Sequence, residues 1–209
     1  MELDEQFKNG LEELRKTKER KFDQTVELII NLQKFDLRKN QVNLFVNVPH
    51  KIKEKKVGAF LEAKNPLVDT IVPDEFKRYS SKNELKKLVK NYDFFIAQAS
   101  LMPKVAATFG RALGPSGKMP SPQLGIILNA DEKTIEDLKN KINSSVKIRT
   151  KEASIKIPVG KQSMNEEDIV ENMSTVFAEI LKNLPREREN IKNVEVKLTM
   201  SKPYKISIR

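Results

Sequence analysis

The chain has 209 residues with no cysteine and one histidine, so it offers no disulfide framework, no thiolate nucleophile and no His-rich metal site. Lys and Arg outnumber Asp and Glu by 39 to 29, and the formal charge of +10 favours a polyanionic partner, most often a nucleic acid. No stretch has the length of a transmembrane span, and the N-terminus lacks the pattern of a signal peptide. We therefore expect a cytoplasmic, non-catalytic protein with no membrane partner, no cofactor and no metal.

The N-terminal part reads as one helix followed by two strands. Phe7, Leu11 and Leu14 recur at helical spacing and predict a helix over residues 7–18. Alternation over residues 22–32 predicts a strand. Its Phe22, Gln24 and Val26 share one face, and Asp23, Thr25 and Glu27 share the other. A second predicted strand covers residues 42–48, and the polar segment LRKNQ between the two strands favours a hairpin.

Beyond Pro49 the pattern changes to short strands that alternate with helices. The predicted strands cover residues 56–60, 69–72, 94–97 and 126–128, and the predicted helices cover 82–89, 101–109 and 133–143. Such alternation indicates right-handed crossovers and a parallel sheet, which is typical of a small Rossmann-like three-layer domain. Gly110 is expected to end the second helix. The three glycines and three prolines of Gly110–Pro122 then predict a stiff, shaped loop.

The C-terminal part returns to the antiparallel α+β character of the N-terminal part. Strand patterns occur near residues 146–148, 155–159, 194–198 and 206–208, and a helix is predicted over 165–184. The sequence therefore predicts an α/β (α+β) protein in which a discontinuous domain, residues 1–50 and 146–209, contains an inserted Rossmann-like domain, residues 51–145.

The glycine-rich segment fails as a nucleotide-binding phosphate loop. That motif needs Gly five residues before the Gly-Lys pair and Ser or Thr after it, but Gly117-Lys118 has Ala112 before it and Met119 after it. GPSG matches the GXXG form of a KH module only weakly. A nucleotide-using enzyme is therefore disfavoured, while a basic protein–protein module stays open beside RNA binding.

Four segments of the chain resemble the L-one family of large-subunit ribosomal proteins in its archaeal form. They are KFDQTVELIINL, LGPSGKMPSP, IPVGKQSM and KLTMSKPYKI, and they occur in the order typical of that family. The resemblance implies a hinged two-domain protein of the ribosome that binds the rRNA of the mobile side stalk near the tRNA exit site. It also implies that the protein assists release of deacylated tRNA and represses translation by binding its own mRNA.

The resemblance further implies an RNA-binding surface on the discontinuous domain. The residues that match the contact segments of the family are Lys21, Phe22, Thr25, Glu27, Lys161, Ser163, Thr199, Met200 and Ser201. Phe offers an apolar plate to an unstacked base or sugar, and Thr offers a compact donor and acceptor. The family commonly has Gly at the position of Ser201. The Cβ of serine limits the backbone angle φ, which affects any contact that needs the backbone to approach RNA closely. From pattern alone, the first segment also fits a half-buried strand and the last a simple hairpin turn.

Overall fold

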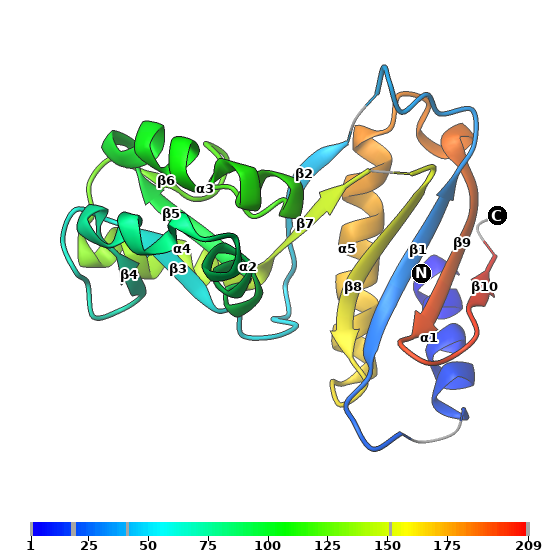
Figure 1. Ribbon diagram of the computed structural model, residues 1–209. Helices are drawn as coiled ribbons and strands as arrows, with labels where there is room; N and C mark the ends of the chain where they lie inside the picture. Colours follow the sequence, from blue (N-terminus) through cyan, green and yellow to red (C-terminus); the bar gives the residue numbers. More distant parts are fainter. Residues whose placement is uncertain (1, 18–19, 41, 151, 208–209) are drawn as a thin grey trace. The chain divides into compact units, whose positions relative to one another are not determined.

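The computed structural model describes residues 2–17, 20–40, 42–150 and 152–207, and they divide into two compact units (Figure 1). The terminal unit comprises residues 1–53 together with 144–209, and the inserted unit comprises residues 54–143. Each unit has its own cluster of buried apolar residues. The predicted fold class, an antiparallel α+β part with an inserted parallel α/β part, is confirmed.

The terminal unit is built on an antiparallel sheet in the order β10-β9-β1-β8. Two helices pack on one face of this sheet, where apolar residues at alternate strand positions, such as Leu28 and Ile30, are fully buried. The other face carries no helix in Figure 1. The elements are α1 (Glu2–Arg15), β1 (Thr25–Leu32), β8 (Ser154–Lys161), α5 (Glu166–Asn183), a 3-10 turn at Glu187–Asn190, β9 (Ile191–Leu198) and β10 (Tyr204–Ile206).

The predicted hairpin of the first two strands is wrong. β2 (Asn43–Asn47) pairs antiparallel with β7 (Ser145–Arg149), so that Val46 lies opposite Val146. β1 has β8 on one side and β9 on the other, which leaves it no free edge for β2. β2 and β7 are the strands that lead out of the terminal unit and back into it.

The N-terminal strand is shorter than the alternation predicted. It begins at Thr25, so Phe22 precedes it and is half exposed instead of sharing the buried face of Gln24 and Val26. The predicted ends at Lys18 and Ile208 lie outside the described residues.

The inserted unit contains a parallel sheet in the order β4-β3-β5-β6. Phe60 and Phe95 of this sheet stack with their ring centroids 5.4 Å apart, in a core completed by residues of α2 and α3. The elements are β3 (Val57–Phe60), β4 (Asp69–Ile71), a 3-10 segment at Pro73–Ser80, α2 (Lys82–Asn91), β5 (Phe94–Gln98), a 3-10 turn at Ala99–Leu101, α3 (Met102–Ser116), β6 (Ile126–Ile127) and α4 (Glu132–Ser144).

The expected helix end at Gly110 is also wrong, because α3 continues to Ser116. Leu113 is fully buried and extends the apolar stripe of Val105 and Phe109 by one more turn, so packing outweighs the roughly 1 kcal/mol that Gly costs inside a helix. The helix ends instead at Gly117, whose φ of 72° is the left-handed conformation that glycine adopts readily. Much of the predicted loop is therefore helical.

Lys118, directly after this helix end, serves a structural role. Its Nζ donates to the carbonyl oxygens of Val89 and Tyr92, at 2.8 and 2.7 Å, at the C-terminal end of α2. A cation at that position also interacts favourably with the helix dipole. This lysine therefore ties the segment after α3 to α2.

Candidate nucleic-acid interface

Three segments distant in the sequence meet at one end of the terminal sheet: the start of β1, the end of β8 and the turn after β9. Thr25 lies opposite Lys161 in the strand register. The backbone N–H of Thr25 donates to Thr199 Oγ1 at 3.0 Å, and the N–H of Thr199 donates to the carbonyl oxygen of Thr25 at 3.1 Å. We call this end of the sheet, formed by residues 20–27, 161–163 and 199–201, the three-segment surface.

Two glutamine side chains connect the three segments. Gln24 is buried, and its Nε2 donates to Gln162 Oε1 at 3.2 Å. Its Oε1 accepts the backbone N–H of Met200 at 3.1 Å, and its carbonyl oxygen accepts the N–H of Gln162 at 2.8 Å. One side chain at the entrance to β1 thus touches both other segments and fixes their positions.

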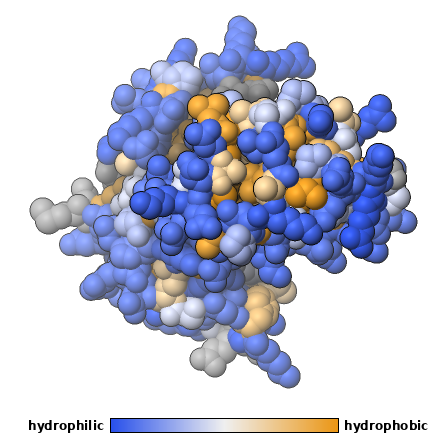
Figure 2. All heavy atoms as spheres, turned by 90° about the vertical axis from the view of Figure 1, so that its left-hand side faces the viewer, coloured by the Kyte–Doolittle hydropathy of each residue, from blue (hydrophilic) through white to orange (hydrophobic). Residues whose placement is uncertain are grey.

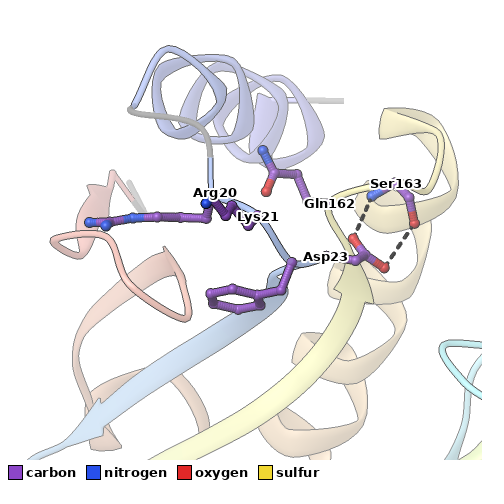
Figure 3. A pocket seen from close by; sticks show the side chains of 6 residues that line it. Arg20, Lys21, Asp23, Gln162 and Ser163 are labelled. Atoms are coloured by element: carbon purple, nitrogen blue, oxygen red, sulfur yellow. Dashed lines mark hydrogen bonds between the residues drawn. The ribbon is translucent and has the colours of Figure 1, made fainter.

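Asp23 and Lys161 hold the outer rim of the surface. The Asp23 carboxylate accepts the backbone N–H and the hydroxyl of Ser163, at 3.1 and 3.0 Å (Figure 3). Lys161 Nζ donates to Thr25 Oγ1 at 3.1 Å. An ammonium has no lone pair to offer, so this bond leaves the hydroxyl proton of Thr25 available to an outside acceptor.

A β-bulge turns the end of β8 toward this surface. Val26 lies opposite Gly160 and Glu27 opposite Pro158, so Val159 is the extra residue. Val159 and Gly160 are consecutive and both buried, and the side chain of Lys161 then reaches Thr25. The bulge depends on Gly160, because a Cβ there would lie 2.8 Å from Ile169 Cγ1 of α5.

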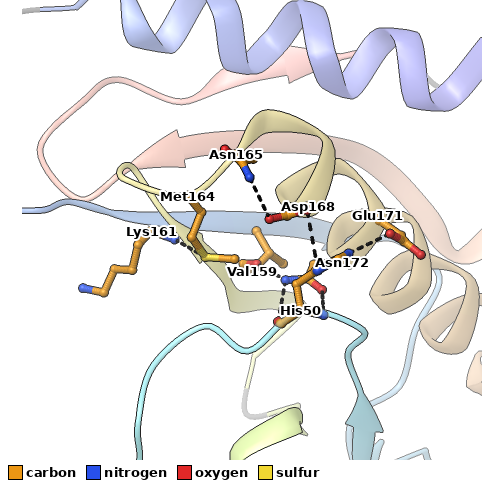
Figure 4. Close-up of polar contacts among 8 residues, drawn as sticks. All are labelled: His50, Val159, Lys161, Met164, Asn165, Asp168, Glu171 and Asn172. Atoms are coloured by element: carbon orange, nitrogen blue, oxygen red, sulfur yellow. Dashed lines mark hydrogen bonds and ion pairs between the residues drawn. The ribbon is translucent and has the colours of Figure 1, made fainter.

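Asn172 connects the bulge to the segment that follows β2. This asparagine is fully buried on α5, and its Nδ2 donates to the carbonyl oxygens of Val159 and His50, each at 2.9 Å. Its Oδ1 accepts the backbone N–H of His50 at 3.0 Å (Figure 4). The His50 ring lies against two acids of α5, with Nε2 2.7 Å from Glu171 and Nδ1 3.5 Å from Asp168. The hydrogen bond with Glu171 raises the pKa of His50, burial opposes the rise, and Asp168 adds to it.

The turn between β9 and β10 is closed by Ser201. Its hydroxyl oxygen accepts the backbone N–H of Leu198 at 2.8 Å and lies within hydrogen-bond distance of the Leu198 and Lys202 carbonyl oxygens. The Ser201 hydroxyl is therefore engaged in hydrogen bonds within the protein, and these side-chain bonds stabilise the turn. The Met200 side chain before it is 59 % exposed.

A hollow of about 390 Å³ opens beside the first two segments. It is lined by Arg20, Lys21, Phe22, Asp23, Gln162 and Ser163 (Figure 3). The Phe22 side chain is 50 % exposed, although a ring of this size is usually buried. Cations and an exposed aromatic ring thus border the same concave site.

The structure places all nine expected residues in the three contacting segments. Glu27 lies two residues beyond Thr25 along β1, opposite Lys197 of β9 and Pro158 of β8. Sequence reasoning missed the connecting role of Asp23, Gln24 and Gln162, and it missed Arg20. Gln24 carried a signal, since a polar residue at an inward-facing strand position needs a buried hydrogen-bond partner.

At the strand ends of the inserted unit, where nucleotides bind in related architectures, polar groups bond to one another. There Ser100 Oγ donates to Glu62 Oε1 at 2.8 Å, and the Glu62 N–H donates to Gln98 Oε1 at 3.4 Å, so these side chains bridge the ends of β3 and β5. In the part of the chain that the structure describes, acidic and His side chains form no group suited to a metal ion, and no helix is long and apolar enough for a bilayer. The face in Figure 2 is mainly hydrophilic, with apolar side chains gathered between hydrophilic ones.

Comparison with known proteins identifies the family of the chain. The family model described as "Ribosomal protein L1p/L10e family" matches residues 14–202. "Large ribosomal subunit protein uL1" of Nanoarchaeum equitans is 36 % identical over 92 % of this chain and 95 % of its own. The proteins of that name from Pyrobaculum islandicum and Archaeoglobus fulgidus are 37 % and 36 % identical, over 92 % and 98 % of this chain and 88 % and 94 % of theirs. The chain therefore belongs to the ribosomal protein L1p/L10e family, as a structural, non-enzymatic ribosomal constituent of the archaeal type.

Proposed function

We propose that this protein binds large-subunit rRNA through the three-segment surface. The observation that carries the proposal is the position of Phe22 and Met200. Among the described residues they are the two most exposed large apolar side chains of the terminal unit, and their segments are joined through Gln24. Exposed apolar side chains among donors and cations suit unstacked bases and sugars, which offer both apolar faces and polar edges.

Each group on the surface has a distinct use toward RNA. The Phe22 ring offers a stacking face to a base, and Met200 offers apolar contact to a sugar. The Thr25 hydroxyl donates its proton to a phosphate or 2′-hydroxyl oxygen, because its bond with Lys161 uses one acceptor lone pair and leaves the proton free. Lys21 and Arg20 supply charge at the hollow, and the Glu27 carboxylate accepts from a base amine or a 2′-hydroxyl.

The connecting residues act by fixing the surface before RNA arrives. The bonds made by Asp23, Gln24 and Gln162 already exist in the free protein. A surface that is ordered in advance loses less conformational entropy on binding. These residues are positioning groups in the proposal, while Phe22, Thr25 and Met200 are contact groups.

The proposal extends to the place of binding and to regulation. The curated relatives are large-subunit proteins, and the four motif segments resemble the family that binds the mobile stalk near the tRNA exit site. The protein then acts on the cytoplasmic ribosome, where it contacts and helps to release deacylated tRNA. A hairpin of its own mRNA that mimics the stalk would use the same surface, so rRNA and mRNA would compete.

Sequencing of crosslinked RNA tests the proposal. The tagged full-length protein is expressed in an archaeal host, crosslinked in the cell and purified under denaturing conditions before its RNA is sequenced. We expect one enriched segment of large-subunit rRNA, together with the protein's own message. RNA fragments spread evenly over all cellular transcripts would overturn specific binding, and absence of RNA beside a crosslinked protein would favour a basic protein–protein module.

A further inference from the structure

The outer surface of α2 and α3 is the most strongly basic helical layer of the inserted unit. The two helices carry six Lys or Arg residues and one acid, Glu84. Residues 54–143 contain 15 basic and 11 acidic residues in all, so the rest of the unit has nine basic and ten acidic residues. The positive charge of the inserted unit is therefore concentrated on these two helices, which pack side by side on one core.

The cations form a regular array on the exposed side of each helix. Lys82, Lys86 and Lys90 recur every four residues along α2, which spaces them about 6 Å apart along the axis. On α3, Lys104 and Arg111 lie about two turns apart on the side opposite the buried stripe. All five are exposed. We call these five side chains the basic face.

The surroundings of the basic face leave it open to a ligand. Lys87 pairs with Glu84 at 3.4 Å, but none of the five cations has an acidic partner among the described residues. Between the two cations of α3 lies Gly110, and beyond Arg111 lies Gly114, and a Cβ at either glycine would meet nothing within 4 Å. A bulky ligand can therefore approach the backbone of α3.

We propose that the basic face binds the sugar-phosphate backbone of structured RNA, as a contact separate from the three-segment surface. Protein partners generally bury an apolar centre, and none of the exposed large apolar residues lies on α2 or α3. The face also has no exposed aromatic ring for stacking, so it positions RNA through phosphates without reading its sequence. The ligand of the basic face is thus structured RNA of any sequence, recognised by its closely spaced phosphates.

Salt-dependent binding of the full-length protein to a plain 24-base-pair RNA duplex tests the proposal. The variant Lys82→Gln/Lys86→Gln/Lys90→Gln removes three charges while keeping good helix formers. The matched control Lys39→Gln/Lys133→Gln/Lys192→Gln removes three exposed lysines from scattered positions. Each lost phosphate contact should lower the slope of log affinity against log salt by about 0.7–0.9. We expect the first variant to lose about 2 in slope and the control less than 1.

Two further variants test whether charge is responsible for duplex binding and whether the basic face is separate from the three-segment surface. The variant Lys82→Arg/Lys86→Arg/Lys90→Arg keeps the charge and should bind the duplex like the wild type. The variant Phe22→Ala/Met200→Ala should bind the duplex unchanged, so its loss of stalk-rRNA binding reports on the proposed function alone. Equal slopes for the Gln variant and its control would overturn the basic face, as would poly-glutamate that competes as well as RNA at equal charge concentration.

Discussion

At the residue scale, the hydroxyl of Thr199 serves the fold of the three-segment surface as well as its chemistry. It accepts the backbone N–H of Thr25 at 3.0 Å and lies 3.4 Å from the carbonyl oxygen of the same residue. The family resemblance marks Thr199 as an RNA contact, and the geometry adds that it joins the turn after β9 to β1. A substitution there changes the shape of the surface as well as one contact.

Thr199→Val should therefore weaken binding of the stalk rRNA and of the mRNA hairpin alike. Valine keeps the volume but removes the hydroxyl, which leaves polar groups of the bound RNA unpaired, so we expect a loss of roughly 1–3 kcal/mol for each RNA. Thr199→Ser keeps the hydroxyl and should bind like the wild type. Titration of labelled mRNA hairpin with unlabelled rRNA measures both affinities. Binding of both RNAs at once, or damage to one alone, would refute the shared surface.

His50 gives the terminal unit a pH-dependent contact between α5 and the segment after β2. Its pKa is raised, chiefly by Glu171, so the folded protein binds the imidazole proton more tightly than the unfolded chain does. The stabilisation is complete below the ordinary His pKa of about 6.5 and is lost as the pH rises through the raised value. His50→Gln should remove this part of the pH dependence of the unfolding midpoint.

Nuclear magnetic resonance can follow this titration without ambiguity, because His50 is the one histidine of the chain. We expect the imidazole signals of the wild type to titrate above 6.5, and those of the double variant Asp168→Asn/Glu171→Gln to titrate at a lower pH. A titration midpoint that is the same in both proteins would show that the two acids do not act on the ring.

At the element scale, local patterns predicted which elements exist better than which elements meet. The long apolar stripe of α5 and the alternation of β9 were visible in the sequence because helix and strand periodicities are local. The partner of β2 is β7, because both edges of β1 are occupied by β8 and β9. These strands lie far from β1 and β2 in the sequence. The end of α3 depended on the burial of Leu113, which outweighed the helix-breaking tendency of Gly110.

The same division holds for the candidate interface. Motifs located its residues, but the bonds of Gln24 to Gln162 and Met200 join positions 138 and 176 residues apart, which no local pattern predicts. The bulge at Gly160 was also invisible, since alternation alone gives no sign of an extra residue.

Gly160→Ala should destabilise the terminal unit by about 1–3 kcal/mol, because its Cβ would meet Ile169, a β-branched and fully buried residue of α5. The matched control is Gly110→Ala, where open space surrounds the Cβ and the helix interior gains roughly 0.5–1 kcal/mol. Urea denaturation of both variants measures the two effects. Equal stability of the two variants would show that the bulge tolerates a side chain.

At the scale of the whole molecule, the two buried clusters share no residue. The terminal cluster draws on residues 7–48 and 146–206, and the inserted cluster draws on residues 60–113. β2 and β7 pair through five positions, which holds the two ends of the terminal unit side by side. The terminal unit therefore has both a core and a closed chain path of its own.

Replacement of residues 54–143 by a short Gly-Ser linker should leave a folded terminal unit. Circular dichroism should show cooperative unfolding, and the shortened protein should still bind stalk rRNA, with a smaller salt slope because the basic face is gone. A shortened protein that folds but does not discriminate stalk rRNA from unrelated RNA would place the specific site outside the three-segment surface.

The affinity of the Phe22→Ala/Met200→Ala variant for stalk rRNA tests the central claim most directly. Stacking of one base on an aromatic ring contributes about 1–3 kcal/mol, so the variant should bind about tenfold more weakly. Its stability should change little, because about half of each side chain is already exposed. Leu128→Ala, at a residue that is 82 % exposed on the inserted unit, is the matched control and should bind like the wild type. Wild-type affinity of the Phe22→Ala/Met200→Ala variant would contradict the three-segment surface as the rRNA-binding site.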